Sequence, residues 1–254
     1  MEIAVIADVH GNDLALAAVL SAIDRAGITE ILALGDHLSG PLNAALTADM
    51  LMARAIVAIS GNHDRALLKT PRPRMGASDG HARDEISPAH LGWLAAMPES
   101  RVHRGEIFLC HGTPARDDAY WMEEPQPDGT MRLAPRARIE AHGAGIACPV
   151  LLCGHSHLPR SVLLANGRLL VNPGSVGCPA YADDTPFPHR VETGSPRARY
   201  ATLARDVSGW RATFHEIAYD HAAMASLARA RGRQDWAGAL ATGWMNEPSA
   251  SLSD

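Results

Sequence analysis

The sequence is poor in cysteine and in aromatic residues. Its four cysteines are Cys110, Cys148, Cys153 and Cys178, and none forms a C-x-x-C pair, so the 254-residue chain is not typical of a disulfide-stabilised fold. Cys110 and Cys153 lie inside apolar runs and are expected to be buried thiols. This cysteine usage favours a reducing compartment, which we expect to be the cytoplasm.

The chain also lacks a long hydrophobic run. Residues 3–7 and 150–153 form short apolar runs, whereas a membrane-spanning helix needs about 20 apolar residues. No basic segment precedes the first run, so it does not resemble a signal peptide. The sequence therefore predicts a soluble protein with no membrane partner.

A strong excess of one charge is absent as well. The chain has 23 Lys and Arg against 28 Asp and Glu, a formal net charge of -5, and no stripe dense in Lys or Arg. A surface that binds long nucleic acid is normally basic, so this balance disfavours such a partner. The 46% hydrophobic content is enough for one substantial core.

Apolar runs alternate with helical periodicity at the start of the chain. Residues 3–7, 31–34 and 55–59 are predicted strands. Between them, helices are predicted from Asn12 to Gly27 and from Pro41 to Arg54. This alternation predicts an α/β protein with a parallel sheet covered by helices.

The rest of the chain is predicted to form one domain with the first part, over residues 1–243, followed by a flexible tail at 244–254. Residues 113–134 are irregular and carry Tyr120 and Trp121. They are predicted to be a lid or insert near the site that shapes substrate choice, with a packed surface loop as the alternative. Further strands are expected at 101–103, 107–110, 150–153, 161–164, 168–171, 200–205 and 210–217, helices at 87–97, 135–142 and 220–231, and loops at 70–85 and 179–198.

Polar side chains follow five predicted strands at the point where each strand ends. Ligands bind at the carboxyl ends of strands in open α/β sheets, and imidazole and carboxylate are natural donors for first-row metals. Any one of these histidines alone would be read as an ordinary surface or core residue, but that reading does not explain the whole set. The segments are Asp8-Val9-His10, Gly35-Asp36, Gly61-Asn62-His63-Asp64, His111-Gly112 and Gly154-His155-Ser156-His157.

This ordered series, over residues 8–157, resembles the calcineurin-like metallophosphoesterase superfamily. Asn172-Pro173-Gly174-Ser175 resembles its small bacterial and archaeal phosphodiesterase-like branch. The resemblance implies a four-layer α/β/β/α sandwich, in which two facing mixed β-sheets are flanked by helices.

The resemblance also implies roles for individual residues. Two divalent metal ions are expected, with Mn²⁺ the first choice and Fe, Ni, Co or Zn as other ions that such donors accept. His63 would sit beside the substrate phosphate, and Asp64 would orient His63. The implied ligands are Asp8, His10, Asp36 and His157 for one metal, and Asp36, Asn62, His111 and His155 for the other, with Asp36 bridging.

The implied reaction is hydrolysis of a phosphodiester or phosphomonoester in a small phosphorylated substrate, by attack of a metal-activated water. A catalytically silent protein-binding scaffold is the alternative from another class, but a scaffold is expected to have lost part of the ligand set, which this chain retains. A phosphoprotein or nucleotide phosphatase is a further alternative. The segment at 35–41 lacks the arginine that protein Ser/Thr phosphatases carry there, which weakens the phosphoprotein alternative.

The remaining histidines have no partner that spacing predicts. His37 is expected to be a partly exposed loop residue, with a supporting position next to the metal ligands as the alternative. The histidines expected to be structural are His142, His189, His215 and His221.

Overall fold

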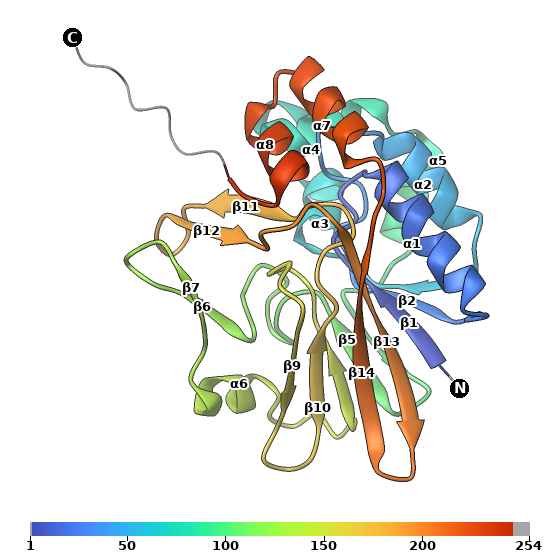
Figure 1. The fold of residues 1–254 in the computed structure, drawn as a ribbon, viewed down its shortest axis with the longest axis vertical. Coiled ribbons are helices and arrows are strands. Elements are labelled where there is room, and N and C mark those ends of the chain that lie inside the picture. Colours follow the sequence, from blue (N-terminus) through green and yellow to red (C-terminus); the bar gives the residue numbers. More distant parts are fainter. Residues whose placement is uncertain (1, 246–254) are drawn as a thin grey trace.

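The computed structural model describes residues 2–245 and contains two five-stranded mixed sheets (Figure 1). In the first sheet the strand order is β14-β13-β1-β2-β3, with β1, β2 and β3 parallel and β13 antiparallel to both β1 and β14. Its strands are β1 (Glu2–Ile6), β2 (Ile31–Ala33), β3 (Ile56–Ala58), β13 (Ala198–Asp206) and β14 (Gly209–Ile217).

The second sheet has the order β4-β5-β8-β10-β9. Its three inner strands are parallel, and the two edge strands run antiparallel to them. The strands are β4 (Ser100–His103), β5 (Ile107–Cys110), β8 (Val150–Leu152), β9 (Arg160–Leu163) and β10 (Leu169–Asn172).

The two sheets pack face to face through one buried apolar cluster. Ile3 and Val5 of β1 contribute from one sheet, and Leu109 and Leu152 contribute from the other. Removing this area from water favours the sandwich by about 25 cal/mol per Å² of apolar surface. The faces of the parallel strands are therefore apolar on both sides, as expected for strands buried between layers.

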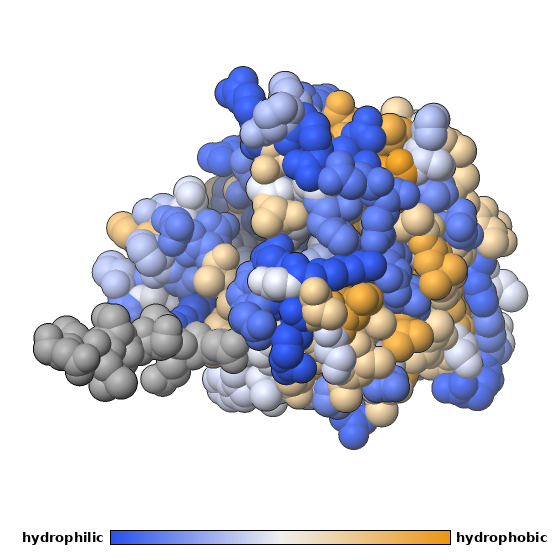
Figure 2. All heavy atoms as spheres, turned by 90° about the horizontal axis from the view of Figure 1, so that it is seen from above, coloured by the Kyte–Doolittle hydropathy of each residue, from blue (hydrophilic) through white to orange (hydrophobic). Residues whose placement is uncertain are grey.

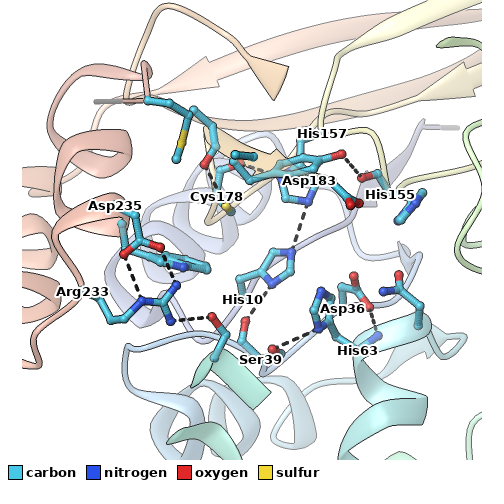
Figure 3. Close-up of a pocket in the computed structure, with 17 residues that line it drawn as sticks. His10, Asp36, Ser39, His63, His155, His157, Cys178, Asp183, Arg233 and Asp235 are labelled. Carbon is cyan, nitrogen blue, oxygen red and sulfur yellow. Dashed lines mark hydrogen bonds and ion pairs between the residues drawn. The ribbon is translucent and has the colours of Figure 1, made fainter. Parts of the chain in front are cut away.

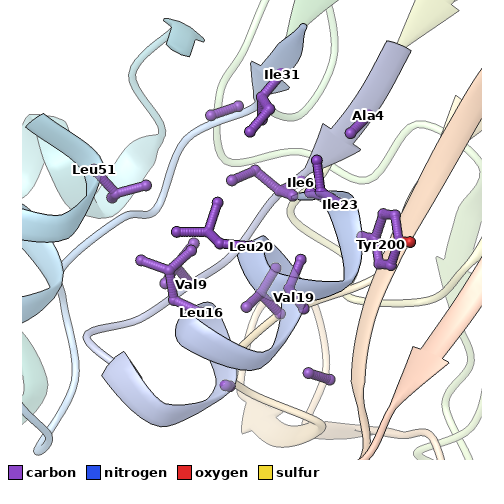
Figure 4. Packing of buried hydrophobic residues seen from close by; sticks show 14 of the residues in the cluster. Ala4, Ile6, Val9, Leu16, Val19, Leu20, Ile23, Ile31, Leu51 and Tyr200 are labelled. Carbon is purple, nitrogen blue, oxygen red and sulfur yellow. The ribbon is translucent and has the colours of Figure 1, made fainter. Parts of the chain in front are cut away.

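Helices cover the outer faces. Leu16, Val19, Leu20 and Ile23 form the apolar stripe of α1 (Asp13–Arg25), which packs on β1 and β2 (Figure 4). The side chain of Asn12 accepts a hydrogen bond from the backbone of Ala15 and caps this helix as predicted. Beside α1 lie α2 (Ala44–Met52) and α5 (Pro88–Ala95), while α6 (Arg136–His142) covers the second sheet. The predicted α/β/β/α class is confirmed.

Two predicted loops are wrong. Residues 70–85 contain η1 (Arg72–Arg74) and α4 (Ala77–Glu85), and 179–198 contain the antiparallel pair β11 (Ala180–Asp183) and β12 (His189–Glu192). The sequence of α4 is polar around most of its circumference, so no periodic apolar stripe announces the helix. The local sequence does not favour this helix strongly, so its packing against α2 and α3 (Asn62–Lys69) stabilises it.

Other elements also fall outside the predicted ones. The chain has α3 (Asn62–Lys69) directly after β3, and α8 (Gln234–Thr242) after α7 (His221–Ala230). Residues 113–134 carry the short hairpin β6 (Glu123–Pro125) and β7 (Met131–Leu133), and Trp121 is buried against the second sheet. This segment is therefore partly core. The predicted tail beyond residue 245 lies outside the described residues.

Hydrophilic residues cover much of the face seen from above, with apolar residues in small groups among them (Figure 2). Within residues 2–245, no helix combines the length and the apolar character that crossing a membrane would require.

The packing of α1 generates a stability prediction. Leu16 is fully buried, so Leu16→Ala is expected to lower the free energy of unfolding by about 2–5 kcal/mol. Leu46, on α2, is 50% exposed, and Leu46→Ala serves as the control with a change of about 0.5 kcal/mol or less. Urea denaturation measures both values, and equal small losses would contradict the described packing.

Candidate metal centre

The five predicted strand-end segments meet at one end of the sandwich. Asp8 and His10 follow β1, Asp36 follows β2, and Asn62 opens α3 after β3. The second sheet contributes His111 after β5, together with His155 and His157 after β8. The carboxyl ends of the parallel strands in both sheets thus bring these side chains together, and Figure 3 shows His10, Asp36, His155 and His157 of this set.

The donor atoms form two groups. Asp8, His10 and His157 make one group, and Asp36, His111 and His155 make the other; within each group the ligand atoms lie within 4.8 Å of one another. Nε2 of His111 lies 3.1 Å from Asp36 and 3.8 Å from Asp8, so the two groups adjoin. Asn62 lines the same pocket.

The backbone at these residues is held in a conformation that most side chains avoid. Among residues 2–245, six non-glycine residues have positive φ, and five of them are predicted ligands: Asp8 (55°), His10 (52°), Asp36 (54°), His155 (67°) and His157 (57°). The left-handed region costs free energy for non-glycine residues and is concentrated at functional sites. The packed sheets hold these turns in place.

Close approach of the turns explains one of the glycines. A Cβ atom at Gly61 would lie 2.2 Å from Oδ1 of Asp36 and 2.7 Å from the backbone nitrogen of Asp36. Any side chain there would displace the carboxylate of Asp36, a donor of the second group. The glycine before Asn62 is thus required by geometry.

Three histidines are oriented by their backbone partners. In each, Nδ1 donates to a carbonyl oxygen at 2.7 Å: Ser39 for His10, Leu34 for His111 and Cys178 for His157. When Nδ1 carries the hydrogen, Nε2 of the neutral ring is an electron-pair donor. The Nε2 atoms of His10 and His157 then face each other at 3.1 Å. Metal-binding histidines are commonly fixed in this way.

The donor set fits divalent cations. Asp8 Oδ1, Asn62 Oδ1 and His111 Nε2 are buried and make no hydrogen bond of normal geometry; the atoms near the first and third, His157 Nε2 at 3.3 Å and Asp36 Oδ2 at 3.1 Å, are donors of the same site. Buried polar atoms without a partner are rare and costly, so three at one site require an explanation. Metal ions bound between these oxygen and nitrogen donors would satisfy them, and such mixed sites accept several first-row metals.

The ionisation of the site is strongly perturbed. Burial alone would lower the pKa of His111, but the carboxylates of Asp36 and Asp8 outweigh it and raise this pKa to about 10. Burial would likewise lower the pKa of His157, yet Asp8 raises it well above its usual range. In the absence of metal, protons therefore occupy nitrogen atoms that a metal would need.

His63 lies beside the donor groups and has an unpredicted partner. Its Nδ1 donates to Asp79 Oδ1 at 2.7 Å, and its side chain is 37% exposed to the pocket. Burial opposes a charged ring, but Asp36 and Asp79 raise the pKa of His63 to about 9. Asp79 belongs to α4, inside the predicted loop, and no motif in the sequence marks it.

Asp64, which was predicted to orient His63, has backbone hydrogen-bond partners instead. The carboxylate of Asp64 accepts hydrogen bonds from the backbone nitrogens of Asp36 (2.8 Å), Gly61 (2.9 Å) and His37 (3.1 Å). It therefore holds the turns after β2 and β3 together. The reason is geometric: Asp64 is the third residue of α3, and its side chain caps the backbone at the start of that helix.

One further histidine differs from expectation. His37 is 1% exposed rather than partly exposed on a loop, and its Nε2 hydrogen-bonds the carbonyl of Ile59 at 3.1 Å. His189, which was expected to be structural, is buried, and its Nε2 hydrogen-bonds the hydroxyl of Tyr120, whose ring stacks on His155 with centroids 4.9 Å apart. Tyr120 thus packs against His155, a predicted metal ligand. The indole of Trp121 lies in the core, where it donates a hydrogen bond to the Ile139 carbonyl.

The donor groups open into a pocket of about 400 Å³. The rest of its lining includes Tyr181 and Asp183 of β11, Trp236 of α8 and Arg233 directly before α8; Asp183 and Arg233 are labelled in Figure 3. Neither Tyr120 nor Trp121 is among the residues that line it. The sequence did not predict these lining residues, because β11 lies in the predicted loop at 179–198 and α8 follows the last predicted helix.

The fold and the donor set are those of a metal-dependent phosphoric ester hydrolase, and comparison with known proteins agrees. The family described as the calcineurin-like phosphoesterase superfamily domain matches residues 1–192. The chain therefore belongs to the calcineurin-like phosphoesterase superfamily, and the predicted family is confirmed.

Two relatives extend the comparison. "Uncharacterized protein MJ0912" of Methanocaldococcus jannaschii is 27% identical over 199 residues, which cover 70% of this chain and 76% of the relative. The crystal structure of a metallophosphoesterase from Sphaerobacter thermophilus is similar with a TM-score of 0.74 and 24% identity, over 96% of this chain and 100% of that one. The second likeness shows that the fold, including the C-terminal elements, is shared.

The raised pKa values generate a prediction about metal uptake. His111 and His157 are expected to lose their protons when metal binds, releasing about two protons per chain at pH 7.5. Affinity should therefore rise as the pH increases from 6 to 8. The pH change on adding Mn²⁺ to metal-free protein in weak buffer measures the release.

A variant pair controls this measurement. His111→Ala is expected to reduce the release by about one proton. His142→Ala, on the outer helix α6, should leave it unchanged. Metal binding without any proton release would show that the two rings are already neutral.

Proposed function

We propose that the chain hydrolyses a small phosphate ester at a centre of two divalent metal ions. The observation that carries this proposal is the pair of adjoining donor groups with three buried, unpartnered donor atoms. Asp8, His10, Asp36 and His157 would hold one metal, and Asp36, Asn62, His111 and His155 the other. Asp36 would bridge them, since it lies 3.1 Å from His111 of the second group and its charge also interacts with His10 of the first.

The metals, when bound, supply Lewis-acid stabilisation of phosphate charge and lower the pKa of water. In the reaction, a water oxygen bonds to phosphorus and the bond from phosphorus to the leaving oxygen breaks. His63 lines the pocket next to Asp36 and Asn62, so its Nε2 would donate a proton to the leaving oxygen. The proton lost by the water restores the charge of the ring through solvent.

The size of the pocket favours a compact substrate. About 400 Å³ is within the range of small-molecule sites, and two acidic residues, Asp183 and Asp235, stand on its outer wall. Asp235 pairs with Arg233 through two hydrogen bonds, which neutralises the arginine. A long polynucleotide would meet little positive charge there, so we propose small phosphomonoesters and phosphodiesters, including short nucleotides, as substrates.

Mn²⁺ is the metal that we propose for the active protein, in the cytoplasm, and Fe, Ni, Co and Zn suit the same donors.

Residues 1–243 are proposed to act as one domain. Support comes from the pocket itself, since His10 near the start of the chain and Trp236 near its end pack against each other with ring centroids 5.9 Å apart.

Metal reconstitution tests the proposed reaction. The protein is stripped with a chelator and reloaded singly with Mn²⁺, Ni²⁺, Co²⁺, Zn²⁺ or Mg²⁺. It is then assayed with p-nitrophenyl phosphate, bis-p-nitrophenyl phosphate and a panel of cyclic and dinucleotides. We expect turnover that needs metal and saturates near two ions per chain. A folded, metal-loaded protein that hydrolyses none of these esters would refute the proposal.

His63 generates a separate prediction. His63→Ala is expected to retain its metal and to lower kcat by about 10²–10⁴-fold, the usual contribution of a general acid. His142→Ala is the matched control, because His142 lies on α6 outside the pocket and should keep full activity. Metal content and kcat are measured on the same preparations, and an unchanged kcat in His63→Ala would remove His63 from the mechanism.

A further inference from the structure

Asp79 reaches the pocket from α4, an element that carries none of the predicted ligands. Its side chain is 14% exposed, and Oδ1 accepts the hydrogen bond from Nδ1 of His63 at 2.7 Å. The same oxygen accepts a bond from the hydroxyl of Ser39 at 2.5 Å, and Ser39 is fully buried. Two groups therefore converge on one carboxylate oxygen beside the catalytic candidate, and Figure 3 shows these two groups, Ser39 and His63, close together.

The orientation of the His63 ring is set by side-chain contacts and not by the backbone. The nitrogen of His63 donates to Asp36 Oδ1 at 2.9 Å, which fixes the main chain at the start of α3 but not the side chain. The ring is set by Asp79, with the Ser39 hydroxyl 3.3 Å from the same Nδ1 and the His10 ring edge-on, its centroid 5.5 Å away. With Nδ1 occupied, Nε2 is the nitrogen available to the pocket.

Asp79 also has the charge that this position requires. Burial would raise its pKa, but the hydrogen bond and charge of His63 lower it, so the carboxylate stays ionised. Of the other nearby carboxylates, Asp36 accepts from the backbone nitrogen of His63, and Asp64 accepts from the backbone nitrogens of three residues. Among residues 2–245, Asp79 is the carboxylate that hydrogen-bonds the His63 ring.

The C-terminal helices hold α4 against the site. Nη1 of Arg233 donates to the Ser78 hydroxyl at 2.8 Å, one residue before Asp79. At the other end of α4, Arg231 pairs with Glu85 at 3.0 Å. Both arginines lie beyond residues 1–192, the part that the family matches, so the support for Asp79 comes from outside the shared catalytic part.

We propose that Asp79 is the positioning residue for His63. Asp79 accepts the Nδ1 hydrogen and aims Nε2 at the leaving oxygen, while the Ser39 hydroxyl fixes the carboxylate. The proton passes from Nε2 to the leaving oxygen as the phosphorus–oxygen bond breaks, and Asp79 remains ionised throughout. This inference rests on the proposed function, because it assumes that His63 serves the hydrolysis of a phosphate ester.

A double-mutant cycle tests the proposal, using the ester with the highest turnover in the reconstitution panel. Asp79→Ala is expected to lower kcat by about 10–100-fold, as misplacement of a reacting group does, with little change in KM or metal content. In the His63→Ala background, the same substitution should change kcat by less than about twofold, because residues that act as a unit are not additive. Asp79→Asn, which keeps the size of the side chain, is expected to lose less than Asp79→Ala.

Asp84→Ala is the matched control on the same helix. Asp84 is 61% exposed and pairs with Arg72 on the surface, so its loss should leave kcat unchanged. If Asp79→Ala fails to fold by circular dichroism, Asp79→Asn takes its place in the cycle. Equal losses in both backgrounds, or loss of metal, would overturn the positioning role and leave the phosphoesterase proposal standing. Absence of turnover in the wild type would overturn both.

Discussion

Electron-pair donors converge in a space from which water is largely excluded, and the rest of the architecture serves this convergence. The Nε2 atoms of His10 and His157 face each other at 3.1 Å, and Oδ1 of Asp8 has no hydrogen-bond partner. Such an arrangement is unfavourable unless protons or cations lie between the donors. The raised pKa of His111 means that a proton can occupy this position when no metal is bound. Metal ions are the cations that fit the chemistry of the donors.

The sandwich supplies the rigidity that this convergence needs. Each sheet ends its parallel strands at the same end of the molecule, and the apolar cluster between the sheets fixes their relative position. The left-handed turns at Asp8, His10 and Asp36 are held by that packing and by their backbone N–H groups, which donate to the Gly35 carbonyl, the Asp36 carbonyl and the Asp64 carboxylate, respectively. The left-handed turns cost free energy, and burial of the neighbouring apolar residues offsets this cost. Ligand residues therefore stand directly beside core residues in the chain.

The pocket is lined by two separate parts of the chain. The donors come from residues 8–157, whereas other lining residues come from β11 and α8. Asp79 and Ser78 on α4 connect the two parts, through His63 on one side and Arg233 on the other. The donors and the remaining lining of the pocket therefore come from separate segments of the chain, which meet where the ring of Trp236 on α8 packs against that of His10.

The sequence by itself determined the strand-end segments and the family, because the donors and glycines stand in local motifs and strand periodicity places them at one edge. Their neighbours were decided only by tertiary structure. Asp64 stands next to His63 in the sequence, yet α3 turns it toward the backbone of Asp36, and Asp79 reaches His63 from 16 residues further along. The helix α4 has no apolar stripe, so its existence and its position depend on packing against α2, α3 and the C-terminal helices. A side-chain contact of that kind leaves no periodic or local signal in the chain.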